Sequence, residues 1–476
     1  MPRLHYWPLG LLLASVCDTP AQAIQANLPW LSQGPSRTVQ TPGAQALATE
    51  LGQDAPALQP LTFNTLPAAT LGLFEAVAIA VSRHPSIISA VSAIEQQQGQ
   101  VDVARAGYYP KVNAGMNSGR VNTYGYGQVA TMSLSQMLHD FGKVEGSVTQ
   151  AQGQVFKQQA LLLKQVDSIA GQTAEAILEV HRQQSLLQIA RDQVVAVEDV
   201  LQRVKLRADS GLTPQSDFIQ ATTRLQSAQA NSQQVGTSLN QWRARLKTLV
   251  GAALPARVAD LPPDLERLAQ LDTPPDYGLL PDVLAAEADR RSAYGQLQNA
   301  KAQRYPTLAL EATANQALSG TNPNNGIRHG SYNTLTLTGS MALYEGGAIS
   351  AQVRGANAAI EHAESTINES RLTAEDALLR AHELAIGARA RLGILAQRMA
   401  SMSETRALYR EQYSVGTRSV LDLLNAEQEV YQAAADQETA RHDFWLGLIT
   451  YIGAAGRSRQ AYGLDTPPTA QGENHP

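Results

Sequence analysis

Proline is missing from two long stretches of this chain, and that absence limits the fold more than any other feature. The 476-residue sequence has 23 prolines, yet none lies from Lys111 to Thr213 and none from Asn324 to Thr466. Because proline removes a backbone donor and breaks helix interiors, long regions without it can form unusually long helices. A proline-rich segment separates the two regions, which suggests a duplicated architecture.

Sequence landmarks recur in the same order in the two halves. They are Tyr109-Pro110 with Tyr305-Pro306 at an offset of 196, residues 138–142 (LHDFG) with 343–347 (LYEGG) at 205, and 211–217 with 416–422 at 205. The offset grows between the first and second landmarks, which places an insertion in the turn-rich segment 322–326 (NPNNG). The sequence therefore predicts two copies of one structural repeat.

Each half contains a pattern typical of a long, packed helix. From Leu162 to Ala208 apolar residues recur at alternating steps of four and three, and the register returns from Ile367 to Tyr413. A helix over residues 143–208 would be roughly 100 Å long. Shorter helices are expected at residues 71–107, 214–251, 279–304 and 419–453. Two short helices stacked end to end would match one long helix, so antiparallel packing of long against short is expected.

Segments with a strand period lie before each long helix. The expected strands are residues 111–118 and 128–136 in the first half, and 307–317 and 331–343 in the second. In the last of these, Leu335 and Leu337 alternate with threonines, which gives one apolar and one polar face. This alternation fits a transmembrane β-barrel, with a soluble hairpin packed on helices as the alternative. Four strands cannot enclose a channel, since about eight are needed, so several chains must share one barrel.

Composition excludes several classes of function. With 37 Lys+Arg against 42 Asp+Glu the formal net charge is −5, and no basic cluster is present that would bind nucleic acid. The single Cys17 permits no intramolecular disulfide, and the nine histidines form no HExxH motif. The sequence also contains no GxSxG motif and no phosphate-binding glycine loop. We therefore expect no enzyme activity, no metal, no cofactor and no nucleic-acid partner.

The N-terminal segment has the features of a secretory signal. Arg3 precedes an apolar run at residues 9–16, and Ala21-Gln22-Ala23 offers the small-x-small pattern of a signal peptidase site. The run is too short to span a bilayer, which takes about 20 apolar residues. The mature chain is therefore expected to begin at Ile24, with a lipidated Cys17 as the alternative.

These observations give a domain organisation. It comprises a signal peptide (1–23), a proline-rich extended leader (24–70), a first structural repeat (71–254), a linker (255–281), a second structural repeat (282–456) and a flexible tail (457–476).

The ordered combination of motifs resembles the TolC family of outer-membrane channel proteins over about residues 71–456. The matching motifs are residues 104–110 (ARAGYYP), 138–143 (LHDFGK) and 413–418 (YSVGTR), together with the duplicated strand-strand-long-helix order. The resemblance implies a mainly α chain with a membrane β-barrel part. Its long antiparallel helices would form a periplasmic tunnel, and three chains would each give four strands to a twelve-stranded barrel.

The resemblance also implies which residues close the tunnel. Tyr413 and Arg418 in the second helical turn match the family's gate, with Ser216 and Asp217 of the first turn as their expected partners. The acidic constriction ring of the family matches Asp422, whereas Asn425 stands where the best-known members have a second Asp. One carboxylate ring instead of two should weaken cation focusing. The alternative is that the aspartates only favour a positive helix N-terminus and that the arginine is solvated.

The implied function is an outer-membrane exit channel that passively conducts substrate from an inner-membrane transporter and a periplasmic adaptor to the outside. The segment 100–105 and the following Tyr-Tyr-Pro look similar to members serving type I secretion, which implies a homotrimer in outer-membrane lipid with an ABC-type transporter. Multidrug efflux is the alternative within the family. An exported coiled-coil adaptor or structural protein is the alternative of a different class.

Overall fold

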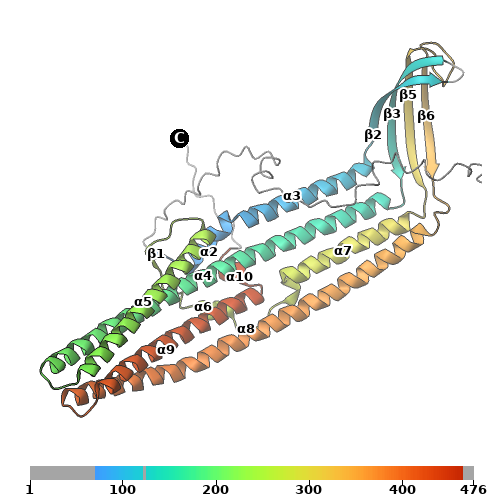
Figure 1. The fold of residues 1–476 in the computed structure, drawn as a ribbon. Helices are drawn as coiled ribbons and strands as arrows, with labels where there is room; N and C mark the ends of the chain where they lie inside the picture. The colour runs from blue at the N-terminus through green and yellow to red at the C-terminus, as the bar shows by residue number, and fades with distance from the viewer. Residues whose placement is uncertain (1–69, 122–124, 465–476) are drawn as a thin grey trace, which may run out of the picture. The chain divides into compact units, whose positions relative to one another are not determined.

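The computed structural model describes residues 70–121 and 125–464 (Figure 1). The expected signal peptide and nearly all of the expected leader lie outside these residues. So does the last part of the expected tail, from residue 465 onward. Those three expectations therefore remain predictions.

The described chain repeats one order of elements. The first copy contains α2 (Leu73–Arg83), α3 (Pro85–Arg105), η1 (Ala106–Tyr108), β2 (Lys111–Val121), β3 (Gly125–His139), α4 (Lys143–Asp209) and α5 (Gln215–Val250). The second contains α7 (Pro281–Ala302), β5 (Thr307–Ser319), β6 (Ser331–Ser340), α8 (Ala348–Ser414) and α9 (Val420–Ala454). Outside the copies lie β1 (Thr70–Leu71), β4 (Arg257–Val258), α6 (Leu265–Ala269), η2 (Tyr277–Leu279) and α10 (Ser458–Ala461).

The predicted duplication is confirmed by the backbone of the long helices. Helices α4 and α8 have 67 residues each. Each begins after a glycine in the left-handed region, Gly142 at φ 98° and Gly347 at φ 89°. Each is followed by another such glycine, Gly211 at φ 72° and Gly416 at φ 81°. Both pairs are related by the offset of 205 seen in the sequence, so the same turn chemistry starts and stops both helices.

The single helix expected over residues 71–107 is wrong, because it breaks at His84. Pro85 cannot donate to the helix and pushes His84 to an extended conformation with ψ 128°. The Nδ1 atom of His84 then accepts from the Ser86 backbone N–H at 3.3 Å, which caps the new helix α3. No single helix among the described residues is apolar and long enough to cross a membrane. The α2–α3 pair, bent by 45°, meets that requirement only when its two parts are counted together.

The four predicted strands form one antiparallel sheet in the order β2-β3-β5-β6. The register aligns Val112 with Leu134, Leu134 with Ala312 and Ala312 with Leu335, so one face is apolar across all four strands. The opposite face is polar, and on it the Thr131 hydroxyl donates to Asn315 at 2.8 Å. Strand β6 ends at Ser340, three residues before the expected end.

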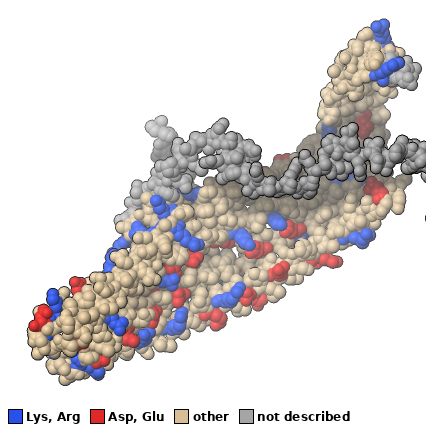
Figure 2. Space-filling model, viewed as in Figure 1, with Lys and Arg blue, Asp and Glu red and all other residues tan. Residues whose placement is uncertain are grey.

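The apolar face of the sheet is open in the single chain. Relative exposures are 57% for Val112, 58% for Met132, 70% for Leu335 and 67% for Leu337. Figure 2 shows few charges on the strands, whereas both signs are spread along the helices. A sheet with one exposed apolar face and one polar face is the pattern of a membrane barrel wall.

The long helices pack against the short ones as expected (Figure 1). Helix α4 contacts α3 and α5 as well as α7 and α9, and α8 contacts α7 and α9. Helices α4 and α7 approach each other closely. A Cβ atom added to Gly146 would lie 2.5 Å from the backbone N of Asn299 and 2.8 Å from the backbone O of Gly295. Glycine is therefore required there to let the two backbones meet.

The segment expected as a linker is packed, which corrects the expectation of a simple connection at residues 255–281. Strand β4 pairs in parallel with β1, and Leu265 of α6 is buried in the same cluster as Leu246 and Ile452. The Tyr451 hydroxyl donates to the Leu271 carbonyl at 3.0 Å. Apolar residues between the prolines are therefore sufficient to hold this segment on the helices.

The flexible tail expected from residue 457 is also wrong over its described part. The Arg457 guanidinium donates to the carbonyls of Ala269, Gln270 and Thr273 at 3.0, 3.1 and 2.8 Å. Tyr462 is 4% exposed, and burial raises the pKa of its hydroxyl. Residues 457–464 thus complete the central cluster of the helical part instead of extending from it.

Candidate functional site

The two helical turns expected to contain the gate lie side by side (Figure 1). The first connects α4 to α5 and the second connects α8 to α9. Beneath them is one buried apolar cluster with residues from both hairpins: Val197, Val200, Val204, Ala221, Tyr413, Val420, Leu423 and Leu424. The turns therefore belong to one packed unit, as a gate formed by both would require.

Tyr413 is the centre of the contact between the turns. It is 6% exposed, and the Arg207 guanidinium lies 5.1 Å from the ring centroid. The Nη1 of Arg207 also donates to the Tyr413 carbonyl at 3.2 Å. Burial raises the pKa of the Tyr413 hydroxyl; the Arg207 charge opposes this rise and the Asp217 carboxylate adds to it. The phenol is therefore neutral at neutral pH, and its buried hydroxyl has no hydrogen-bond partner among the described residues, so the expected bonds to Ser216 and Asp217 are not formed within the single chain.

Arg418 does not reach its expected partners within the single chain. Its Nε donates to Gln412 Oε1 at 2.9 Å, its guanidinium lies 4.4 Å from the Tyr409 ring centroid, and Asp422 is 3.7 Å away. These acceptors belong to its own hairpin, so short local contacts satisfy the guanidinium. Ser216 instead donates to the neighbouring Asp217 carboxylate at 3.5 Å.

Arg207 is the residue that the sequence reasoning missed. It lies on the last turn of α4, four residues before Gly211. The heptad pattern gives no signal for it, because that pattern follows apolar positions only. Arg207 links the two turns through a charge-assisted hydrogen bond and a cation–π contact, which makes it a fifth candidate beside the four expected gate residues.

The two expected ring residues have different surroundings. The backbone N–H of Asp422 donates to the Ser419 hydroxyl at 3.2 Å, and that hydroxyl donates to the Asp422 carboxylate at 2.9 Å. Ser419 thus caps α9, and Asp422 lies in the first turn of that helix, where its carboxylate also favours the positive N-terminus. Asn425 is exposed, and its Oδ1 accepts from Arg224 of α5 at 3.3 Å. A cation therefore lies beside the position at which the resemblance implies a second carboxylate in the best-known members.

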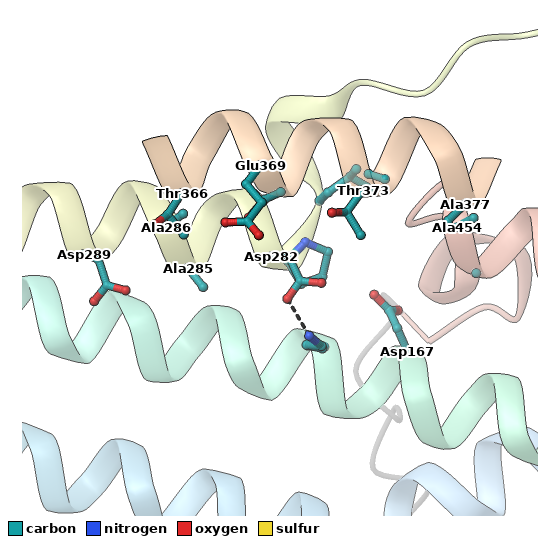
Figure 3. Close-up of a pocket in the computed structure, with 16 residues that line it drawn as sticks. Asp167, Asp282, Ala285, Ala286, Asp289, Thr366, Glu369, Thr373, Ala377 and Ala454 are labelled. Atoms are coloured by element: carbon teal, nitrogen blue, oxygen red, sulfur yellow. Dashed lines mark hydrogen bonds and ion pairs between the residues drawn. The ribbon is translucent and has the colours of Figure 1, made fainter. Parts of the chain in front are cut away.

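A cavity of about 490 Å³ among α4, α7, α8 and α9 has no catalytic arrangement (Figure 3). Three of its four carboxylates contact cations: Asp282 contacts Lys164 at 2.6 Å, Asp289 contacts Lys157 at 2.8 Å, and Asp167 contacts Arg459 at 3.5 Å; the fourth, Glu369, is exposed. Within residues 70–121 and 125–464, no three His, Cys, Asp or Glu side chains are placed to bind a metal ion. These pairs hold helices together.

A duplicated helical hairpin with a four-stranded sheet, apolar on one face, defines a subunit of an outer-membrane channel. The family model for "Outer membrane efflux protein" matches residues 77–252 and 280–448, which is most of the chain. The chain belongs to this family.

Relatives and solved structures agree with that assignment. The efflux protein BepC of Brucella suis is 23% identical, with 78% of this chain and 82% of BepC covered. The alkaline protease secretion protein AprF of Pseudomonas aeruginosa is 26% identical, with 81% and 85% covered. The outer membrane protein VceC of Vibrio cholerae has a similar fold, with a TM-score of 0.69 at 19% identity and 81% and 96% covered.

Membership of the outer membrane efflux protein family confirms the class of protein that the sequence analysis expected. The protein is an outer-membrane channel with a long periplasmic extension, and it is not an enzyme. Its fold class is that of trimeric channels, in which three chains each supply four strands to a twelve-stranded barrel. Channels of this family work in tripartite systems with a periplasmic adaptor and an inner-membrane transporter.

Proposed function

We propose that this channel is the exit duct of a type I protein secretion system, paired with an ABC-type transporter and embedded in outer-membrane lipid. The observation that supports secretion most is the alignment with AprF, a protein named for protease secretion, over 433 residues. The exposed apolar face of the sheet fits contact with lipid chains. The polar face, with its Thr131–Asn315 bond, would line the water-filled lumen.

Multidrug efflux is the second candidate, because BepC is named for efflux and covers a similar share of the chain. Secretion and efflux predict different phenotypes when the channel is missing.

If the function is secretion, deleting the gene in its own host should remove one or a few proteins from the culture medium and leave drug susceptibility within about twofold of the parent. Quantitative mass spectrometry of the medium and growth-inhibition assays measure both. An unchanged set of released proteins with a large gain in susceptibility would contradict secretion.

The paired turns form the proposed closed end of the tunnel, with Tyr413, Arg418, Ser216 and Asp217 as gate residues. The contact between Arg207 and Tyr413 supports this assignment, because it joins α4 to α8 at that end. Asp422 would line the constriction beyond the turns. In this arrangement Arg224 partly neutralises the ring, since its guanidinium lies at Asn425.

The ion selectivity of the open channel tests the constriction. Replacing Arg224 with glutamine should shift the reversal potential in a salt gradient towards cation selectivity, because a positive charge is removed from each chain. Replacing Asp422 with asparagine should shift it the opposite way. Arg203→Gln is the control, since Arg203 is exposed and pairs with Asp199 of its own helix. If neither Arg224→Gln nor Asp422→Asn changes the reversal potential, these residues do not line the narrowest point.

A further inference from the structure

Two histidines from distant parts of the chain share a hydrogen bond in the middle of the helical part. Nδ1 of His181 on α4 lies 2.8 Å from Nε2 of His442 on α9. The other ring nitrogen of His181 lies 3.2 Å from a carboxylate oxygen of Asp260, just after β4. The other ring nitrogen of His442 lies 2.8 Å from the Glu438 carbonyl. Both rings meet the edge or face of Trp445.

The hydrogen-bond acceptors at the two ends, the Glu438 carbonyl and the Asp260 carboxylate, determine which ring nitrogens of the two histidines are protonated. The Glu438 carbonyl can only accept, so His442 Nδ1 must carry a proton and its Nε2 must accept. His181 Nδ1 must therefore donate to His442. The Asp260 carboxylate also accepts, so His181 Nε2 must carry a second proton. All three bonds exist together only when His181 is a cation and His442 is neutral.

The surroundings favour that distribution of charge. His442 is 1% exposed, and its pKa is lowered to about 4: burial is the largest cause, the charges of His181, Arg182 and Arg441 add to it, and the hydrogen bond to the Glu438 carbonyl opposes it. The other charged groups around the pair contact one another: Arg182 with Glu179 and Asp443, Arg391 with Asp443, and Arg441 with Glu438, whose carboxylate also lies 3.6 Å from His442 Nδ1. Asp260 is thus the carboxylate that faces His181 directly, and its side chain is otherwise fully exposed.

We propose that Asp260, His181 and His442 form a pH-sensitive clasp that fastens the segment after β4 to helices α4 and α9. The clasp is closed when His181 has both protons. When His181 loses one proton, it can keep its bond to His442 or its bond to Asp260, but not both. Because His442 is buried and needs a donor, the exposed Asp260 bond is the one released. The segment between the two repeats then loosens as the pH rises through the range in which imidazoles titrate.

Hydrogen–deuterium exchange on the full-length trimer in detergent tests this clasp. Peptides from residues 255–264 should be several-fold more protected at pH 5.5 than at pH 8.0, after correction for the intrinsic exchange rate. The lower pH stays above the pKa of His442, about 4, so that ring remains neutral. Asp260→Asn and His181→Gln should each remove the difference. His362→Gln is the control, because His362 is an exposed histidine on α8.

A second measurement separates the clasp from general effects of pH. In protein with ¹³C-labelled histidine Cε1, the His181 signal should differ between pH 5.5 and pH 8.0, and Asp260→Asn should reduce that difference. Asp260 is fully exposed, so this variant keeps the packing intact. Equal protection at both pH values in the wild type would overturn the proposal. So would a difference in the His181 signal between the two pH values that Asp260→Asn leaves unchanged.

Discussion

Valine in place of Gly146 is expected to push helices α4 and α7 apart and to prevent a stable trimer from forming. The added side chain would meet the backbone N of Asn299 and the backbone O of Gly295, neither of which can rotate away. Overpacking of this kind costs about 3 kcal/mol or more per chain, because two helix backbones must move. It would also strain the hydrogen bond from Asn299 Nδ2 to the Lys143 carbonyl, which is 2.7 Å long.

Thermal dissociation of the trimer, followed on native gels, measures this effect. The control is Gly171→Val on the same helix, where an added Cβ would meet nothing within 4 Å. Valine has a better helix propensity than glycine, so the control should be neutral or slightly more stable. An equal loss of stability in both variants would mean that the α4–α7 approach is not the reason.

Much of the fold could be predicted because its signals are local. The glycines before and after each long helix, such as Gly142 and Gly416, are needed at those positions for their positive φ. The strand faces follow from a period of two, which the observed register retains between Leu134 and Leu335. Pro85 is also a local signal, since it indicates a helix break. The apolar pattern continues across it, so one helix was expected where the structure has a break at His84.

The packing of the segment between the repeats could not be predicted in the same way. Its six prolines indicate irregular backbone, and irregular backbone is compatible with a free linker or with a docked one. Whether the segment is free or docked depends on partners far along the chain, such as Arg457, whose guanidinium donates to carbonyls that follow α6. A single sequence gives no means of pairing residues at that separation.

In the candidate site, too, contacts between residues far apart in the sequence could not be predicted. Tyr413 and Arg418 could be named because they belong to a motif with neighbouring matches in the chain. Arg207 and Arg224 could not, since each meets its partner through the relative register of two hairpins about 200 residues apart. The same holds for His181 on α4. Its bond to His442 likewise depends on that register.

The largest functional change is expected from Arg207→Met, which keeps the aliphatic stem and removes the charge. This variant loses the bond to the Tyr413 carbonyl and the contact with the Tyr413 ring. A hydrogen bond from a charged group contributes about 1.5 to 3 kcal/mol, and a partly buried cation–π contact about 1 kcal/mol. The trimer has three such contacts, so the closed state loses more than ~5.5 kcal/mol in total. A loss of that size is enough to change a gate from mostly closed to mostly open.

Tyr413→Phe with Arg418→Ser should have a smaller effect, because Arg418 contacts only its own hairpin within one chain. Any effect of that double variant would come from contacts between chains.

Single-channel recording in planar bilayers measures all of these variants. Conductance should rise strongly in Arg207→Met and stay at the wild-type value in Arg203→Met, a control one helical turn away whose only ion pair is with Asp199 on the same helix. Trimer stability on native gels should be similar in both, since the gate lies at the end of the helices and away from the α4–α7 contact. Wild-type conductance in Arg207→Met would show that the link between the turns does not hold the tunnel closed. The turns would then have only the capping role that Ser419 and Asp422 display.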